Sequence, residues 1–129
     1  MKARTISRTF AAFLAAAAFG SAAPAFAYKA CQVTDLGGVD DKGFNQTAWE
    51  GVQEAEKSLG VEGKLLESKA ETDYEPNVNS FVAEKCDIII TVGFLLGDAT
   101  KKAAEANPGI KFSIVDFAYD PVIPNVLGQ

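Results

Sequence analysis

The 129-residue chain contains no histidine. Without an imidazole, it can build neither a His-based catalytic triad nor a histidine-ligated metal site. It has only two cysteines and no C-x-x-C pair, which disfavours a thiol redox motif and a zinc site. Its glycines form no G-x-G-x-x-G sequence, so the dinucleotide-binding fingerprint is absent. The sequence therefore predicts neither a metal nor an organic cofactor.

The N-terminal segment has the features of an export signal. Three basic residues within positions 2–8 precede an apolar, uncharged run at 9–23, and Ala-Phe-Ala at 25–27 fits the small-x-small pattern of signal peptidase sites. We expect residues 1–27 to be a signal peptide cleaved after Ala27, and the protein to be periplasmic or on the cell surface. An N-terminal anchor helix is the alternative, although the apolar run is short and rich in alanine.

The remaining chain is acidic. Removal of residues 1–27 takes away three of the 12 basic residues and none of the 17 acidic ones, which leaves a net charge of −8. A surface of this sign repels phosphate backbones. We therefore expect no nucleic acid among the partners.

Short apolar runs alternate with helical patterns after residue 28. Strands are expected at 30–34, 64–67, 87–92 and 112–115, with a fifth opening within 122–127, and helices at 46–59, from Pro76 onward and at 97–106. Asn45 is placed to cap the first helix, Gly60 to end it, and Trp49 to pack in the core. The β-branched run 87–92 predicts a strand buried on both faces. This order predicts an α/β fold with a doubly wound parallel sheet.

The predicted strand ends carry a distinctive set of side chains. Asp35 follows the first strand, Gly93 and Phe94 follow the third, and Asp116 and Phe117 follow the fourth. Ligands of such sheets bind beyond the carboxyl ends of the strands. A carboxylate can accept hydrogen bonds from vicinal hydroxyls, and a phenyl ring can stack on a flat heterocycle. No Arg or Lys stands at these three strand ends, so the set suits a sugar that carries a heterocycle better than an anion.

Each of these residues also has a purely structural interpretation. Asp35 could form a turn, Asp40 and Asp41 could be solvated turn residues, and Phe44 could pack on the sheet. An enzymatic alternative is a small flavodoxin-like hydrolase that uses Asp35 and Asp116 as a carboxylate pair. We disfavour it because no nucleophile–base partner and no phosphate cradle are present, and we predict that the protein is not an enzyme.

The two cysteines, Cys31 and Cys86, lie on or beside strands that neighbour each other in the usual doubly wound order. An even number of cysteines in an exported protein suggests a disulfide. Adjacent parallel strands seldom give ideal disulfide geometry, so two small buried hydrophobic residues are the alternative.

Residues 35–51, DLGGVDDKGFNQTAWEG, resemble the first signature of the basic membrane protein (BMP) family, the substrate-binding proteins of ABC transporters, many of which bind purine nucleosides. The segment 86–117, with its I-T-V-G-F and F-S-I-V-D-F runs, is similar to a second family block, and PNVLG to the start of a third. The resemblance covers 29–129. It implies an extracytoplasmic binding protein that delivers a purine nucleoside to a membrane permease. A ribose-like sugar is the alternative ligand.

The resemblance also implies roles for individual residues. Asp35 corresponds to the ribose-binding carboxylate, Phe44 to a base-stacking ring and Asn45 to the polar residue beside it. Gly93, Phe94 and Asp116 correspond to the ends of the third and fourth strands. Gly43 stands where the family usually has serine. Family members have two lobes of the periplasmic-binding-protein type I, whereas residues 28–129 resemble only the N-terminal part of the first lobe.

Overall fold

The computed structural model describes residues 26–129. The expected signal peptide therefore falls almost wholly outside the described residues. Within residues 26–129, no helix combines the length and the hydrophobicity that crossing a bilayer requires.

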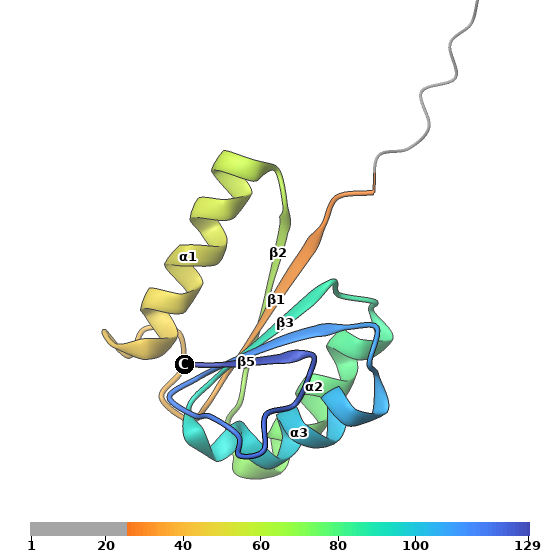
Figure 1. The fold of residues 1–129 in the computed structure, drawn as a ribbon. Coiled ribbons are helices and arrows are strands. Elements are labelled where there is room, and N and C mark those ends of the chain that lie inside the picture. The colour runs from red at the N-terminus through yellow and green to blue at the C-terminus, as the bar shows by residue number, and fades with distance from the viewer. Residues whose placement is uncertain (1–25) are drawn as a thin grey trace, which may run out of the picture.

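Five strands, all parallel, form one sheet in the order β2-β1-β3-β4-β5 (Figure 1). The strands are β1 Lys29–Thr34, β2 Glu62–Glu67, β3 Ile88–Val92, β4 Lys111–Val115 and β5 Val126–Gly128, and the helices are α1 Phe44–Leu59, α2 Tyr74–Ala83 and α3 Gly97–Ala106. Short 3₁₀ turns at Glu71–Asp73 and Phe94–Leu96 precede α2 and α3. The predicted α/β class and parallel sheet are confirmed. The strand order reverses between β1 and β3, where doubly wound sheets bind ligands.

The main core lies between the sheet and the pair α2 and α3, which cover the same face (Figure 1). Alternate strand residues point to this face because side chains in a strand have a period of two. From the strands, Val33, Ile89 and Ile114 are fully buried, and they meet Val78 and Phe81 of α2.

The opposite face is covered only in part. Helix α1 packs mainly on β1 and β2, and it leaves a groove of about 1030 Å³ between itself and the β3–β5 half of the sheet. Ile88 and Ile90 of β3 point into this groove and are only half-buried. The prediction that this strand is buried on both faces is therefore wrong. Trp49, predicted in the core, is likewise only half-buried.

The end of α1 follows the predicted signal. Gly60 adopts a left-handed conformation with φ 69°, and its N–H donates to the carbonyl oxygen of Glu56. Glycine reaches this region without the steric cost that a Cβ adds. The helix therefore stops at Leu59 and the chain turns into β2.

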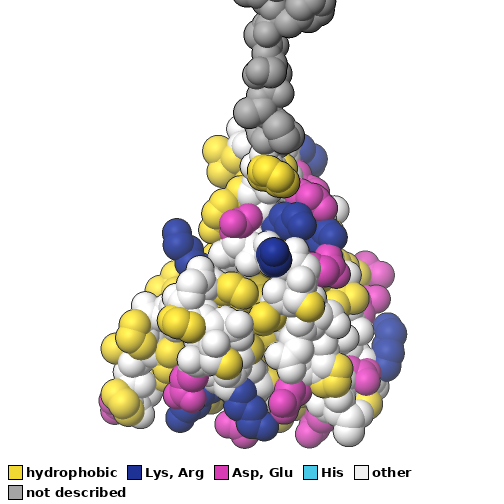
Figure 2. Space-filling model, turned by 90° about the vertical axis from the view of Figure 1, so that its right-hand side faces the viewer, with side chains coloured by type: hydrophobic (Ala, Val, Ile, Leu, Met, Phe, Trp, Pro, Cys, Tyr) yellow, Lys and Arg dark blue, Asp and Glu magenta, His cyan; other side chains and the backbone are white. Residues whose placement is uncertain are grey.

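Charged side chains of both signs are interspersed on the face shown in Figure 2. Lys64 of β2 forms ion pairs with Glu62 and Glu84, and Lys102 of α3 pairs with Glu75 of α2 at 3.0 Å. All these groups are substantially exposed. Such pairs contribute little to stability, about 0–1 kcal/mol each, so the fold depends on its apolar core and on the cross-link described next.

Cys31 and Cys86 form a disulfide, and their Cα atoms are 6.2 Å apart. Cys31 lies in β1, whereas Cys86 lies in the turn between α2 and β3, three residues before the β3 residue that pairs with Cys31. Both side chains are buried. The bridge therefore ties the turn after α2 to β1, an inner strand of the sheet, away from the carboxyl ends of the strands.

Replacing both cysteines by alanine is expected to lower the free energy of unfolding by about 4 kcal/mol, because the bridge closes a loop of 55 residues and restricts the unfolded chain. Urea unfolding of the variant measures this difference. Chemically reduced wild-type protein is the control, because it loses the cross-link but keeps both side chains. A reduced protein as stable as the oxidised one would contradict the prediction.

Candidate ligand-binding site

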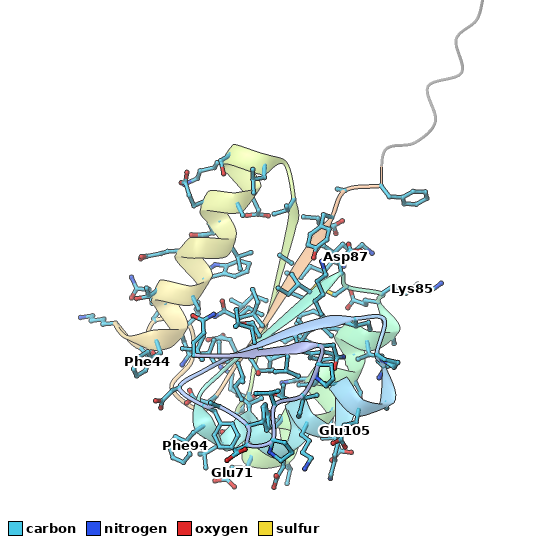
Figure 3. The ribbon with its side chains drawn as sticks, viewed as in Figure 1. Phe44, Glu71, Lys85, Asp87, Phe94 and Glu105 are labelled. Atoms are coloured by element: carbon cyan, nitrogen blue, oxygen red, sulfur yellow. A yellow bond between two sulfur atoms is a disulfide. The ribbon has the colours of Figure 1, made fainter. Side chains whose placement is uncertain are left out.

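The carboxyl ends of β1, β3 and β4 form one rim. Thr34 pairs with Val92, and Val92 with Val115, so the residues that follow these strands stand side by side. Phe44 and Phe94 lie at this end of the molecule, whereas Lys85 and Asp87 lie at the other (Figure 3). The structure therefore brings the strand-end residues together as the sequence predicted.

Asp35 is held in one orientation at this rim. Its Oδ1 accepts hydrogen bonds from the backbone N–H of Gly37 at 2.9 Å and from Nδ2 of Asn45 at 2.8 Å. Its Oδ2 lies against Gly93, where a Cβ would approach within 2.4 Å. No donor within residues 26–129 bonds to Oδ2. The protein therefore fixes one oxygen of Asp35, while the other has no hydrogen-bond partner among the described residues.

Asn45 does not cap α1, contrary to prediction. The helix begins at Phe44, so Asn45 lies inside its first turn, only 2% exposed. Its Nδ2 donates to Asp35 and, at 3.0 Å, to Oδ2 of Asp41. Its Oδ1 is buried without a hydrogen-bond partner in the described part of the chain. Asn45 thus links two carboxylates instead of capping the helix.

The cap is supplied by Asp41. Its Oδ1 accepts from the backbone N–H groups of Gly43 and Gln46, and its Oδ2 accepts from the N–H of Asn45. Burial opposes ionisation, but these hydrogen bonds outweigh it and lower the pKa of Asp41 below its usual value. Asp41 is exposed in the bend before α1, as the interpretation of a solvated turn residue implies, but it also caps the helix. Asp41 stands two residues before Gly43, the residue that directly precedes α1. This spacing could have indicated a helix cap, but it was missed because the helix was predicted to start two residues late.

Glu67, the last residue of β2, also holds the loop. Its Oε1 accepts a hydrogen bond from the N–H of Val39 at 2.8 Å. This bond is the main reason that the pKa of Glu67 is lowered, with a further contribution from Lys69. Sequence reasoning did not identify this residue, because the contact joins positions 28 residues apart. Carboxylates at residues 35, 41 and 67 thus organise the loop between β1 and α1.

Two aromatic rings stand exposed at the rim. Phe44, the first residue of α1, is 61% exposed, and Phe94, which follows Gly93, is 59% exposed. Leu36, which follows Asp35, and Leu95, which follows Phe94, are also exposed. The interpretation that Phe44 packs on the sheet is wrong. Exposed apolar side chains gathered at one place mark binding surfaces, and phenyl rings in particular offer stacking faces.

Asp116 completes the row of strand-end residues. It is exposed and adopts φ 67°, a region that non-glycine residues rarely occupy. Such conformations cost free energy and tend to occur at functional sites. Among the described residues, no group of three His, Cys, Asp or Glu side chains is arranged to hold a metal ion. The rim therefore offers hydroxyl acceptors and stacking surfaces.

Comparison with known proteins identifies the family. The family model of PnrA-like ABC transporter substrate-binding proteins, named Bmp, matches residues 29–128. The chain belongs to the Bmp family. This confirms the resemblance seen in the sequence.

Three similar proteins show how much of a Bmp protein the chain represents. It is 40% identical over 98 residues to the CD4+ T-cell-stimulating antigen of Listeria monocytogenes, covering 72% of this chain and 28% of that protein. It is 42% identical over 96 residues to the ABC transporter nucleoside-binding protein BmpA of Lactococcus lactis, covering 68% of this chain and 26% of that protein. A solved solute-binding protein of an ABC transporter system from Aeropyrum pernix superposes with a TM-score of 0.70 at 27% identity, covering 78% of this chain and 27% of that chain.

This Bmp chain thus spans just over a quarter of the length of these two curated relatives. The assignment of Asp35, Phe44, Asn45, Gly93, Phe94 and Asp116 to ligand binding stays a prediction.

Gly93→Ala is expected to destabilise this Bmp chain by about 3 kcal/mol, because φ is 107° there and the new methyl group would collide with Asp35. Gly60→Ala is the matched control. It also places alanine at positive φ, but in open space, so about 1 kcal/mol is expected. Urea unfolding compares the two. Equal losses of unfolding free energy in the two variants would show that the space between residue 93 and Asp35 accommodates a methyl group.

Asp41 should make stability depend on pH. Its pKa in the folded chain is lowered from 3.8, so its contribution is present above that value and is lost as pH falls through the folded-state pKa. Asp41→Ala is expected to destabilise the protein by about 1 kcal/mol near pH 7, the usual cost of losing a helix cap, and by less at an acid pH below the folded-state pKa, where the carboxyl group is protonated. Asp40→Ala, which removes a carboxylate from the same loop, is the control. A difference that stays constant between the two pH values would refute the assignment.

Proposed function

We propose that the chain is part of the extracytoplasmic solute-binding component of an ABC importer, and that its rim binds one side of a purine nucleoside. Family membership supports the transport role. The observation that carries the ligand class is the pairing of the fixed Asp35 carboxylate with the exposed rings of Phe44 and Phe94. The name of the Lactococcus lactis relative, a nucleoside-binding protein, supports the same class.

Each half of a nucleoside finds a suitable partner at the rim. The free Oδ2 of Asp35 can accept hydrogen bonds from ribose hydroxyls, and a phenyl ring can stack on the purine. Stacking requires only a flat π surface, so it tolerates different bases, whereas the carboxylate selects for the sugar. The role proposed here is therefore binding, and the membrane permease of the importer is the proposed partner that receives the ligand.

Calorimetry on the longest natural polypeptide that carries these residues tests the ligand class. Adenosine, guanosine, inosine and ribose are the probes, and chromatography of the same samples detects any released base. We expect at least one nucleoside to bind and to be recovered intact. Binding of ribose without binding of any nucleoside would contradict the purine assignment. Release of free base from a nucleoside would indicate the hydrolase alternative.

Phe44→Ala is expected to weaken nucleoside binding by about 1–3 kcal/mol, the range for losing one aromatic stacking surface. Leu59→Ala is the control, because Leu59 is also exposed but lies at the far end of the same helix. The control should bind like wild type. If Phe44→Ala also binds like wild type, the ring does not contact the base.

A further inference from the structure

Asp41, Asn45 and Asp35 form a chain of side-chain hydrogen bonds behind the rim, called the relay below. Asp41 accepts a hydrogen bond from Nδ2 of Asn45 at 3.0 Å, and the same nitrogen donates to Oδ1 of Asp35 at 2.8 Å. Asp41 itself is anchored by three backbone N–H groups at the start of α1. We propose that Asp41 is a positioning residue of the ligand site, acting through Asn45 to fix the orientation in which the Asp35 carboxylate meets the ligand. This inference rests on the proposed function.

The two carboxylates determine how the Asn45 amide is oriented. A primary amide has a donor end and an acceptor end, which differ little in shape. In the observed orientation, both hydrogens of Nδ2 point to carboxylate oxygens. The reverse orientation would bring Oδ1 against two negative charges. Asn45 is 2% exposed, so water has little access to replace a lost partner. Asp35 and Asp41 together therefore hold the amide in one state.

The orientation of Asn45 decides what Asp35 presents. With Asn45 and Gly37 both donating to Oδ1, the Asp35 carboxylate cannot rotate without breaking two hydrogen bonds. Its Oδ2 stays beside Gly93, facing the rim. If Asp41 no longer held Asn45, the carboxylate would have to be ordered when the ligand binds, and that ordering would lower affinity. Asp41 would thus affect binding without touching the ligand.

A simple helix cap is the competing explanation, because Asp41 also accepts the backbone N–H groups of Gly43 and Gln46. The two explanations differ in one respect. A cap acts on the helix whether or not residue 45 is asparagine, whereas positioning requires the Asn45 side chain. Asp40 provides a control for charge, since it is exposed and makes no hydrogen bond or ion pair with the described residues.

The first measurement is nuclear magnetic resonance of the Asn45 side-chain amide in the unliganded, asparagine-labelled full polypeptide. In wild type, the amide should exchange slowly with solvent. Asp41→Asn should speed its exchange roughly tenfold, because one of two hydrogen bonds is lost, and Asp40→Asn should leave it unchanged. An amide that exchanges equally slowly in Asp41→Asn would overturn the relay.

The second measurement is a double-mutant cycle on affinity for adenosine, guanosine and inosine, with Asp41→Asn combined with Asn45→Ala, and with Asn45→Ser if the alanine variant does not fold. Asp41→Asn alone should weaken binding by roughly three- to tenfold, and by less than about twofold once Asn45 is removed. Equal losses in both backgrounds would reduce Asp41 to a helix cap. If wild type binds none of the three nucleosides, the proposed function fails, while the amide exchange still decides whether the relay exists.

Discussion

The arrangement of the rim depends on one hydrogen-bonded bridge, in which the Asn45 amide lies between the carboxylates of Asp35 and Asp41. Two carboxylates this close would repel each other, but an amide nitrogen with two hydrogens can satisfy both. The bridge joins the end of β1 to the start of α1, so the loop between them has little freedom. A ligand would meet a carboxylate whose orientation is already set, and preorganisation of this kind limits the entropy lost on binding.

The parallel sheet decides where this bridge can act. Because β1, β3 and β4 run in the same direction and in register, Asp35, Gly93 and Asp116 follow one another along a single edge. Glycine at 93 lets the chain pass close to Asp35, where any side chain would collide. The disulfide braces the opposite end of the sheet and leaves the rim unobstructed. The stabilising cross-link and the proposed binding surface therefore occupy different ends of the molecule.

Much of the fold could be predicted because its signals are local. The β-branched run of β3 and the glycine after α1 each act within a few residues. One error arose where distant contacts decide. Ile88 and Ile90 look like residues of a fully buried strand, yet α1 lies over β1 and β2 and leaves them half-buried. Another error was local. Asn45 looks like a helix cap, but Asp41, four residues earlier, accepts the backbone N–H groups at the start of α1, and the Asn45 side chain bonds to Asp35.

The sequence by itself determined the α/β class, the family resemblance and the identity of the strand-end residues, because hydrophobic periodicity and turn residues are properties of short segments. Only the tertiary structure decided that the two cysteines meet and that Phe44 and Phe94 stand exposed at one end. These outcomes depend on distances between atoms of separate elements. Such distances are set by how the helices pack on the sheet, and that packing is a property of the whole fold.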